Sequence, residues 1–540
     1  MLRDAAVSLS LANLCFVKVW SRMLSSAGSY FNEFPIVYLS LILDVVLLAS
    51  CFWIGITLVR RTRFEFLARL SRWSLLLALL TVANGIAALL LTFLPRSPIA
   101  FMGRTPANVT GFVLTLLTIS LVLIWRARVL KLAPRLLLAL LPFVLLTFAQ
   151  GIWRLASFAP AVAHAASKPA SVAPVPRAHA ASRVLWIIFD ELDQKLAFAD
   201  RPSTLKLPEL DRLRSESVYA THAYPPAPLT YMSMPALISG KLVSRVTPVS
   251  AGELMIDFDG QQGSVPWSQQ PGVFSEARQS GFTTGLAGWA HPYCEVIGNS
   301  LTKCDEVKEK SDAEMTLGSS MFLQAEGLIA TVPLVQMASL PLIQRIGFLS
   351  HIVTKAERQK YRARYEHVLE SALAAANDTE LDLVLVHSPM PHPPGIYDRV
   401  RREFTLNSRS SYIDNLALVD RMVGELRSSM ESAGTWQNTT VVISADHWWR
   451  SEMWARGPFW TKEDAQYAPA RMDHRIPFVL KLAGQNQGLT YDQPFNTVVT
   501  HDLLLALLRG EVSNAANATN WLDRHRSIGD GPYNRDELLP

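Results

Sequence analysis

Four long apolar stretches in the first third of the chain constrain its fold more than any other feature. They cover residues 34–59, 73–94, 109–125 and 136–152, and each approaches the roughly 20 apolar residues that a membrane-spanning helix needs. A shorter apolar piece at 5–20, interrupted by Lys18, leaves open whether the first 25 residues add a fifth span. The sequence therefore predicts a membrane domain over residues 1–155 with four or five transmembrane helices.

Two arginine-rich loops give this domain an orientation. Residues 60–72 hold five arginines, and residues 126–135 hold three arginines and a lysine. Because positively charged loops remain in the cytoplasm, both loops are expected there. Everything after about residue 155 then lies outside, so we expect a multi-pass protein of the plasma membrane, the inner membrane in a Gram-negative cell, with a periplasmic or other extracytoplasmic domain.

The rest of the chain divides at an Ala/Pro/Ser-rich segment, residues 156–182, whose composition is typical of a linker. Beyond it, the sequence predicts an extracytoplasmic domain over residues 183–540. Short apolar runs at 184–189, 381–386, 440–444 and 477–482 indicate buried strands, and they alternate with amphipathic stretches such as 361–376 and 412–433. This pattern predicts an α/β domain with a mainly parallel central sheet between layers of helices.

Polar residues follow three of the predicted strands. Asp190-Glu191 comes after the first, His387 ends the second, and Asp446-His447 comes after the third. Ligands bind at the carboxyl ends of parallel strands, and mixed oxygen and nitrogen ligands suit zinc or manganese. Calcium and magnesium remain open, and an isolated Asp-His pair is more often structural.

A nucleophile is predicted at Thr230, just before an apolar segment that ends at Gly240. A hydroxyl at a helix N-terminus benefits from the helix dipole, and a nearby metal would lower its pKa. The alternative is that Thr230 or Ser233 is only an N-cap. Local sequence alone favours that alternative.

Six segments between residues 183 and 484 resemble the alkaline-phosphatase superfamily, in its sulfatase and phosphoethanolamine or phosphoglycerol transferase branch. In chain order they read LWIIFDELD, TYMSMPALISG, GVFSEARQSGFTTGLAGWAH, HSPMPHPP, YIDNLALVDRMVGELRSSMESAGTWQNTTVVISADHW and DHRIPFVLKLAG. The resemblance implies that Thr230 is the nucleophile and also a metal ligand. It implies the remaining metal ligands as well: Asp190, Glu191, Asp446 and His447. His392 would bind the substrate or assist the leaving group, and His474 is a further candidate for the second role.

The sequence departs from the family at several positions. A threonine stands where formylglycine sulfatases have cysteine or serine, which resembles the lipid head-group transferases, as the membrane helices do. The Asp190-Glu191 pair instead resembles sulfatases, as does Arg475, a candidate for substrate binding. Trp448 replaces the usual glycine after the Asp-His pair, and with Trp449 it could form an apolar or glycan-binding wall.

The resemblance implies a transferase that moves a phosphoryl head group from a phospholipid donor, through a phosphothreonine, to an envelope glycan or lipid acceptor. A sulfatase-like hydrolase or phosphodiesterase is the first alternative, and a non-catalytic membrane domain is the second. The net charge of +5, without a basic and aromatic stripe, disfavours nucleic-acid binding. Cys294 and Cys304 are a candidate disulfide if their domain lies outside the cytoplasm, although two free thiols are the alternative.

Overall fold

The protein comprises two compact units of discontinuous sequence. The computed structural model describes residues 2–24, 35–61, 65–93, 117, 119–165, 180, 182–250, 253–307, 317–329, 331–332, 348–455, 457, 459–468 and 473–526. The helical unit contains residues 1–167, 248–251 and 310–351, and the α/β unit contains 168–247, 252–309 and 352–540. Most of the predicted linker lies outside the described residues, but its first part, up to Ala165, is helical.

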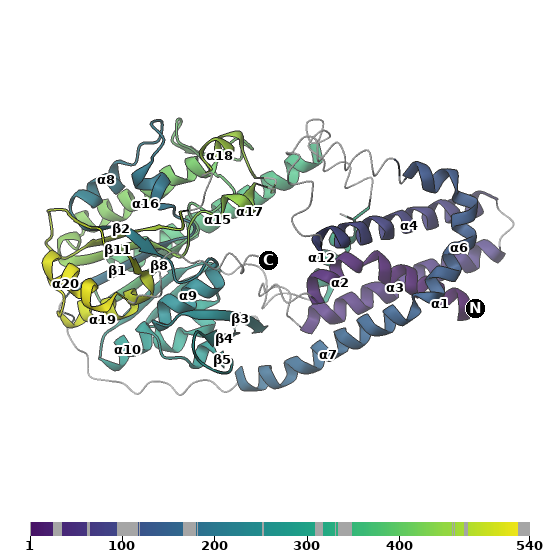
Figure 1. Ribbon diagram of the computed structural model, residues 1–540, viewed down its shortest axis with the longest axis horizontal. Helices are drawn as coiled ribbons and strands as arrows, with labels where there is room; N and C mark the ends of the chain where they lie inside the picture. The colour runs from purple at the N-terminus through teal and green to yellow at the C-terminus, as the bar shows by residue number, and fades with distance from the viewer. Residues whose placement is uncertain are drawn as a thin grey trace. The chain divides into compact units, whose positions relative to one another are not determined.

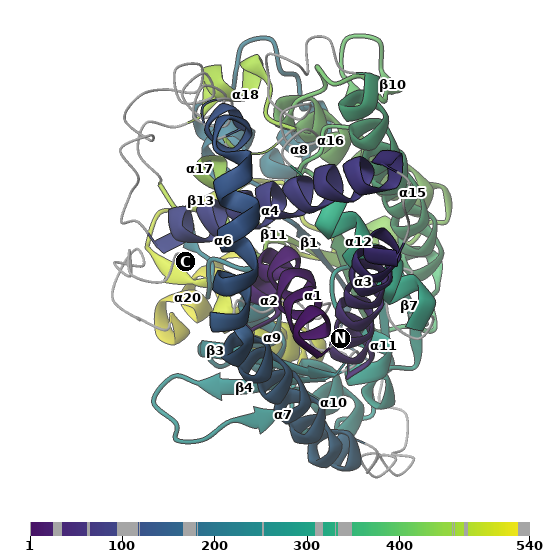
Figure 2. The same cartoon turned by 90° about the vertical axis from the view of Figure 1, so that its right-hand side faces the viewer.

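The helical unit is built around its first helix. Its helices are α1 (Leu2–Cys15), α2 (Val17–Leu24), α3 (Pro35–Arg61), α4 (Glu65–Phe93), α6 (Arg126–Ala139), α7 (Leu141–Ala165) and α12 (Leu317–Ile329). Figure 2 shows α1 surrounded by α3, α4, α6 and α7, and its residues from Leu11 to Cys15 are all buried. With 14 residues, α1 is about 21 Å long, which is too short to cross a bilayer by itself.

Within the described residues, one helix is long and apolar enough to cross a membrane, over Ile36–Leu58. This helix coincides with the first predicted span. The fourth predicted span falls across a 45° bend between α6 and α7, and this bent pair passes the same test only as one broken span. The bend follows from Pro142, which cannot donate the hydrogen bond that would continue α6. The second span lies in α4, and most of the third lies outside the described residues.

The α/β unit confirms the predicted fold class. Its nine-stranded sheet has the order β13-β2-β12-β11-β1-β8-β6-β7, with β14 beside β2. The main strands are β1 (Arg183–Phe189), β2 (Val218–Tyr224), β6 (Thr284–Gly288), β7 (Lys303–Glu306), β8 (Leu383–Ser388), β11 (Thr439–Ala445) and β12 (Ile476–Lys481), and the edge strands are β13 (Leu489–Tyr491) and β14 (Phe495–Asn496). Strand β12 runs antiparallel to both of its neighbours, whereas the other pairs in this sheet are parallel.

Helices cover both faces of this sheet (Figure 1), with α8, α15 and α16 on one face and α9, α10 and α19 on the other. The helices are α8 (Pro208–Ser215), α9 (Thr230–Ser239), α10 (Val273–Gln279), α11 (Tyr293–Val296), α15 (Phe348–Asn377), α16 (Tyr412–Ser432), α17 (Ser451–Trp454), α18 (Lys462–Tyr467), α19 (Thr500–Arg509) and α20 (Ala515–His525). Two small sheets pair β3 (Val243–Ser250), β4 (Glu253–Phe258) and β5 (Val265–Pro266), and β9 (Tyr397–Asp398) with β10 (Glu403–Phe404). The layered core leaves the carboxyl ends of β1, β8 and β11 side by side.

Candidate metal centre and nucleophile

The register of the central strands brings the predicted ligands together. Phe189, the last residue of β1, pairs with Ala445 on one side and with Ser388 on the other. Asp190 and Asp446 therefore leave the sheet at the same level, beside the end of β8.

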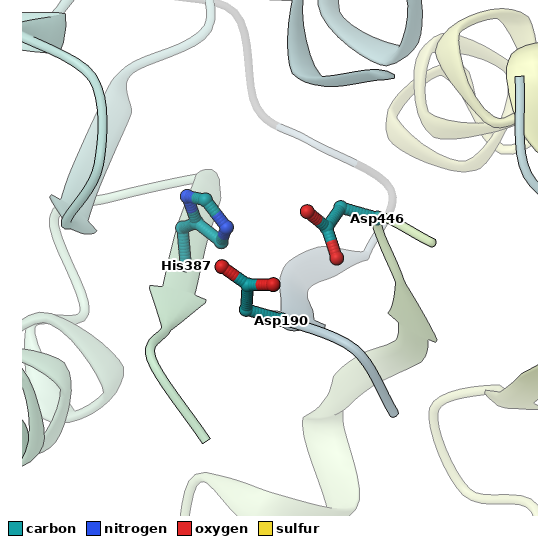
Figure 3. A group of neighbouring side chains, drawn as sticks. All are labelled: Asp190, His387 and Asp446. Carbon is teal, nitrogen blue, oxygen red and sulfur yellow. The ribbon is translucent and has the colours of Figure 1, made fainter. Parts of the chain in front are cut away.

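Three buried atoms at this edge of the sheet accept or donate no hydrogen bond. They are Oδ1 of Asp190, Oδ2 of Asp446 and Nε2 of His387. Figure 3 shows the three side chains pointing toward one another, and one ligand atom from each lies within 4.8 Å of the others. All three residues are at most 1% exposed. A buried polar group without a partner is strongly unfavourable, so three such atoms around one point indicate a site for a cation.

The opposite oxygen of Asp446 is fixed by the backbone. Its Oδ1 accepts hydrogen bonds from the amide of Glu191, at 3.2 Å, and from the amide of His447, at 2.8 Å. These bonds hold the carboxylate so that Oδ2 faces Asp190 and His387. The orientation of this ligand is therefore set before any ion binds.

His447 is held in the tautomer that a metal ligand requires. Its Nδ1 lies 3.0 Å from the carbonyl oxygen of Trp448, which can only accept, so the proton is on Nδ1. The Nε2 lone pair then faces Asp190 Oδ1 at 3.6 Å and Asp446 Oδ2 at 3.4 Å. Burial, followed by the charge of Arg450, lowers the pKa of this imidazole well below its ordinary value, so the ring is neutral.

The hydroxyl of Thr230 lies next to the same cluster. It is the first residue of α9, and its Oγ1 lies 3.2 Å from Nε2 of His447. His291 donates from Nε2 to the Thr230 carbonyl oxygen at 3.1 Å, and Ser233 ties the same helix to the Asp446 carbonyl oxygen at 2.5 Å. The helix that carries the hydroxyl is thus attached directly to the strand end that carries the ligands.

The carboxylates of the cluster repel one another in the absence of a cation. Burial and then the charges of Asp446 and Glu191 raise the pKa of Asp190 well above its usual range. Burial raises the pKa of Asp446 to about 6 and that of Glu191 to about 7. In the described structure, Arg450 is the only cationic partner of these three carboxyl groups. When all three are ionised, two of their negative charges are therefore not compensated. The donor set therefore fits one divalent cation.

Glu191 stands apart from the ligands that face this point. Both of its oxygens are engaged, Oε1 with Arg450 Nε at 2.8 Å and Oε2 with Trp454 Nε1 at 2.8 Å. Its backbone has a φ of 64°, a left-handed conformation that turns the side chain away from the direction of β1. Tyr412 holds this turn by donating to the Glu191 carbonyl oxygen at 2.6 Å. Glu191 could still join Asp190 and His447 around an ion, because its oxygens lie within 4.8 Å of theirs.

His392 lies in an aromatic surround next to this cluster. Its ring centroid is 4.8 Å from that of Trp454, the residue that binds Glu191, and 5.7 Å from that of Trp289. Nδ1 donates to the Pro393 carbonyl oxygen at 2.6 Å, and burial, followed by Arg450, lowers the pKa of the ring to about 3. The ring is therefore neutral, and its Nε2 is available as an acceptor.

The other predicted substrate-binding residues form a separate group. The ring of Trp448 lies 4.2 Å from that of His474, whose backbone φ of 59° is also left-handed. Arg475 forms an ion pair with Asp473 at 2.5 Å and donates to the Thr221 carbonyl oxygen at 3.3 Å. Trp448 touches the metal cluster through its carbonyl oxygen, which accepts from His447 Nδ1. The role of Trp448, His474 and Arg475 in substrate binding stays a prediction.

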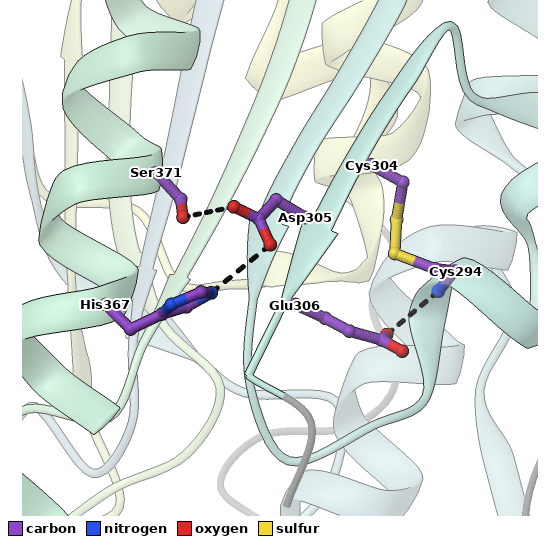
Figure 4. The surroundings of a disulfide bond; sticks show 6 residues. All are labelled: Cys294, Cys304, Asp305, Glu306, His367 and Ser371. Carbon is purple, nitrogen blue, oxygen red and sulfur yellow. Dashed lines mark hydrogen bonds and ion pairs between the residues drawn. A yellow bond between two sulfur atoms is a disulfide. The ribbon is translucent and has the colours of Figure 1, made fainter. Parts of the chain in front are cut away.

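Two residues to which the sequence analysis gave no role, His291 and Tyr293, position two of the key groups. The hydroxyl of Tyr293 lies 2.8 Å from Nδ1 of His387. The next residue, Cys294, is bonded to Cys304 on β7, with a Cα–Cα distance of 5.7 Å (Figure 4). Glu306 accepts from the Cys294 amide at 2.9 Å. His291 ends the GLAGWAH motif and Tyr293 comes two residues later, but no local pattern marks either residue as a support of a metal site.

A buried cluster of candidate metal ligands at the carboxyl ends of a parallel sheet, with a threonine hydroxyl beside it, is the arrangement expected of the alkaline-phosphatase superfamily. The chain belongs to the sulfatase family, whose model matches residues 182–509. Members of this superfamily depend on metals, and they include both hydrolases and transferases. The chain is therefore a sulfatase-like ester hydrolase or phosphotransferase.

Several solved structures are similar to part of this chain at low sequence identity. The phosphonate monoester hydrolase from Silicibacter pomeroyi is 15% identical, with a TM-score of 0.39, over 61% of this chain and 73% of that one. The sulfatase PsFucS1 from Pseudoalteromonas sp. is 15% identical, with a TM-score of 0.35, over 60% and 67%. The lipoteichoic acid synthase LtaP from Listeria monocytogenes is 13% identical, with a TM-score of 0.36, over 61% and 72%. No curated protein matches the sequence. At these values the similarities identify no substrate.

Proposed function

We propose that this protein is a membrane-anchored, metal-dependent transferase. It would move a phosphoryl head group, phosphoethanolamine or phosphoglycerol, from a phospholipid to a glycan or lipid acceptor of the cell envelope. The position of Thr230 supports this proposal most directly, because its Oγ1 lies 3.2 Å from His447 Nε2, the ring nitrogen that faces both aspartates of the cluster. A threonine cannot supply the formylglycine nucleophile of sulfatases.

The transfer takes place in two displacements at phosphorus. In the first, Thr230 Oγ1 bonds to phosphorus, the bond to the diacylglycerol oxygen breaks, and the hydroxyl proton passes by way of an aspartate to the departing oxygen. In the second, an acceptor hydroxyl attacks the phosphothreonine and Thr230 recovers a proton. A divalent cation in the cluster, with zinc or manganese as the best match to its ligands, would supply the positive charge that lowers the hydroxyl pKa and stabilises the non-bridging oxygens.

Three groups of this chain would hold that cation: Asp190, Asp446 and His447. His387 Nε2 faces the same point, so it is a further ligand in this proposal. The neutral ring of His392 can accept a hydrogen bond at Nε2, which suits the orientation of an acceptor hydroxyl in the second step better than protonation of a leaving group in the first.

A membrane anchor fits a lipid donor. Helix α3 is apolar enough to cross a bilayer, and the positive charge of the arginine-rich loops favours a position of the α/β unit outside the cytoplasm. The proposed location is therefore the inner or plasma membrane, with several spans and an extracytoplasmic catalytic unit that lies near the head groups of its donor.

A hydrolase is the second candidate, because the same residues would release the group to water. The match of residues 182–509 to the sulfatase family, which includes many esterases, favours it. The two candidates share Thr230 and the metal ligands, and differ only in the acceptor of the second displacement.

The intact mass of the purified protein, after incubation with phosphatidylethanolamine or phosphatidylglycerol, tests the proposal. We expect a head-group adduct on the wild-type protein with one of these donors and none on Thr230→Ala. Ser239→Ala is the matched control, because this hydroxyl of the same helix bonds only the Pro235 carbonyl oxygen, and the adduct should persist. Metal-loaded protein that forms no adduct with either lipid would contradict the transferase and favour the hydrolase.

A further inference from the structure

Helix α12 (Leu317–Ile329) belongs by sequence to the catalytic region but by structure to the helical unit. The residues on either side of its segment, up to Glu309 and from Ile352 onward, belong to the α/β unit. The helix itself packs against α3 and α2. The chain therefore leaves the α/β unit, adds a helix to the N-terminal bundle, and returns.

Buried hydrogen bonds attach this helix to α3. Ser320 and Ser40 share a hydrogen bond of 2.6 Å between their hydroxyls. Gln324 donates from Nε2 to the Val37 carbonyl oxygen and to Ser40 Oγ, both at 2.8 Å. These side chains are at most 5% exposed. Because polar groups in an apolar bundle need partners, such bonds fix one position and register of the helix.

The attachment extends beyond these two residues. Leu328 packs against the apolar clusters of the bundle, and it continues the face of Ser320 and Gln324 at a spacing of four. Gly327 lies against Val19 of α2, where a Cβ atom would be 3.4 Å from the valine side chain. Just after the helix, the Thr331 carbonyl oxygen accepts from Asn84 of α4 at 2.8 Å. One face of α12 is thus fully occupied by the bundle.

The opposite face presents large apolar side chains. Phe322 is 67% exposed and Ile329 is 54% exposed, and seven positions separate them, which is two helical turns. On the neighbouring α3, Leu39 and Leu47 are exposed as well. Helix α12 packs against α3, the proposed membrane anchor, and both helices expose large apolar side chains, which points to the hydrocarbon of the bilayer as their shared environment.

The length of the helix limits how it can enter a membrane. Its 13 residues give about 20 Å, less than the roughly 30 Å of a bilayer core. The chain on either side of this segment belongs to the α/β unit, so both ends of the segment must lie on the same side of the membrane. A short helix that enters and leaves on one side satisfies both conditions, provided that its backbone is covered by protein.

From these observations we propose that α12 is a second membrane attachment of the catalytic chain, a helix that inserts beside α3 without crossing the bilayer. This inference rests on the proposed membrane anchor. It goes beyond that anchor because α12 would attach the catalytic region to the membrane independently of the segment between Ala165 and Arg183.

Cleavage of that segment tests the proposal. A recognition sequence for a specific protease is placed between Ala165 and Arg183, and the full-length protein is reconstituted into phosphatidylglycerol-containing vesicles. After cleavage, the fragment that begins near Arg183 should float with the vesicles. In the double variant Phe322→Asp and Ile329→Asp, two charges enter the apolar layer, and the floating fraction should fall at least about tenfold. Val400→Asp, at an exposed apolar residue of the α/β unit, is the matched control and should float like the wild type.

Each outcome bears on a different claim. An uncut protein that fails to float would overturn the proposed anchor itself. If the uncut protein floats but the wild-type fragment is released after cleavage, only the role of α12 is overturned. The same holds if the fragment of the double variant stays with the vesicles like the wild type.

A second measurement applies if the double variant does not fold. Phe322→Cys, in a Cys51→Ser background, is labelled with a fluorophore in the uncut protein and mixed with lipids brominated along their acyl chains. The label should be quenched, whereas the same label at Val400→Cys should not. Equal quenching at the two positions would contradict insertion.

Discussion

The two units of this protein differ in what they expose. Among the described residues, every large apolar side chain that is exposed belongs to the helical unit except Val400 and Met453. The α/β unit buries its apolar residues in a layered core and has the surface of a domain in water. The helical unit exposes leucine, isoleucine and tryptophan along its helices, which water would disfavour and which lipid would not.

The units also differ in how they treat buried polar groups. In the helical unit, Ser40, Ser320 and Gln324 bond one another between helices, as do Thr147 and Asn13 at 3.2 Å. In the α/β unit, the buried acceptors of Asp190 and Asp446 point at the same spot and are not bonded there. The bonds between Ser40, Ser320 and Gln324 fix the packing of helices, whereas the unbonded oxygens of Asp190 and Asp446 prepare a site for an ion.

Asp446→Asn is the sharpest test of this distinction. The amide oxygen can still accept from the amides of Glu191 and His447, but the charge that faces the cation is lost. We expect metal affinity to fall by more than the roughly 10–100-fold that supporting residues contribute, with activity falling alongside. The metal-free protein should unfold at a higher temperature, because the carboxylates no longer repel one another. Metal titration and thermal unfolding with and without metal measure these effects. A metal-free variant that is less stable than the wild type would show that the cluster is a structural network.

The pH dependence of metal binding should follow the raised pKa values of the cluster. A protonated carboxyl group cannot bind a cation, and the pKa values of Asp446 and Glu191 are about 6 and about 7. Affinity should therefore rise with pH between about 5 and 7, changing about tenfold per pH unit for each proton displaced. The lowered pKa of His447 keeps this ligand neutral throughout that range. Calorimetric titrations from pH 5 to 8 measure the slope, and a flat profile would contradict a carboxylate-based site.

Tyr293→Phe removes a support of the site rather than a ligand. The His387 imidazole loses the hydroxyl partner at its Nδ1, so its Nε2 is less firmly directed at the cluster. We expect metal affinity to fall about tenfold, with little change in the unfolding temperature of the metal-free protein. Tyr365→Phe is the matched control, because this buried hydroxyl has no hydrogen-bond partner among the residues that the structure describes. Equal effects of the two substitutions would show that Tyr293 only packs the core.

Asp420→Asn should have the smallest effect and should involve no metal. Asp420 on α16 accepts from the Leu210 amide of α8 at 2.8 Å, and burial raises its pKa to about 7. An acid whose pKa is raised on folding stabilises the protein while protonated, and this stability is lost as the pH rises through about 7. The asparagine should remove that loss, which stabilises the protein by on the order of 1 kcal/mol above pH 7. Unfolding experiments at pH 5 and 8 measure the difference, and a variant that loses metal would place Asp420 in the wrong group.

The sequence predicted those parts of the site that depend on strand ends. Asp190, Asp446 and His447 directly follow apolar runs, and parallel strands bring their ends together whatever the details of the loops. The strands and the sheet were predicted for the same reason, since buried parallel strands have a strong local pattern.

The parts that the sequence did not predict depend on contacts between distant residues. Glu191 binds Arg450, which lies 259 residues further along the chain. The left-handed backbone of Glu191 could not be predicted either, because no glycine marks that position. His387 was recognised at a strand end, but no sequence pattern indicated that its Nε2 faces the same point as the carboxylates of Asp190 and Asp446. The membership of α12 in the helical unit was missed because a short apolar helix looks the same in a soluble core and in a bundle.

The shared hydroxyl bond between Ser40 and Ser320 has a consequence for biosynthesis. Its two ends are 280 residues apart, so at roughly 5–20 residues per second the ribosome needs on the order of 15–60 s to supply the second after the first. During that interval α3 has been made, but α12, which binds its buried polar groups, has not. Strands β1, β2, β6 and β7 of the large sheet are synthesised in the same interval. Maturation of the N-terminal bundle therefore waits for translation of the downstream region, and a ribosome that stalls before residue 317 would leave an incomplete bundle for quality-control proteases to recognise.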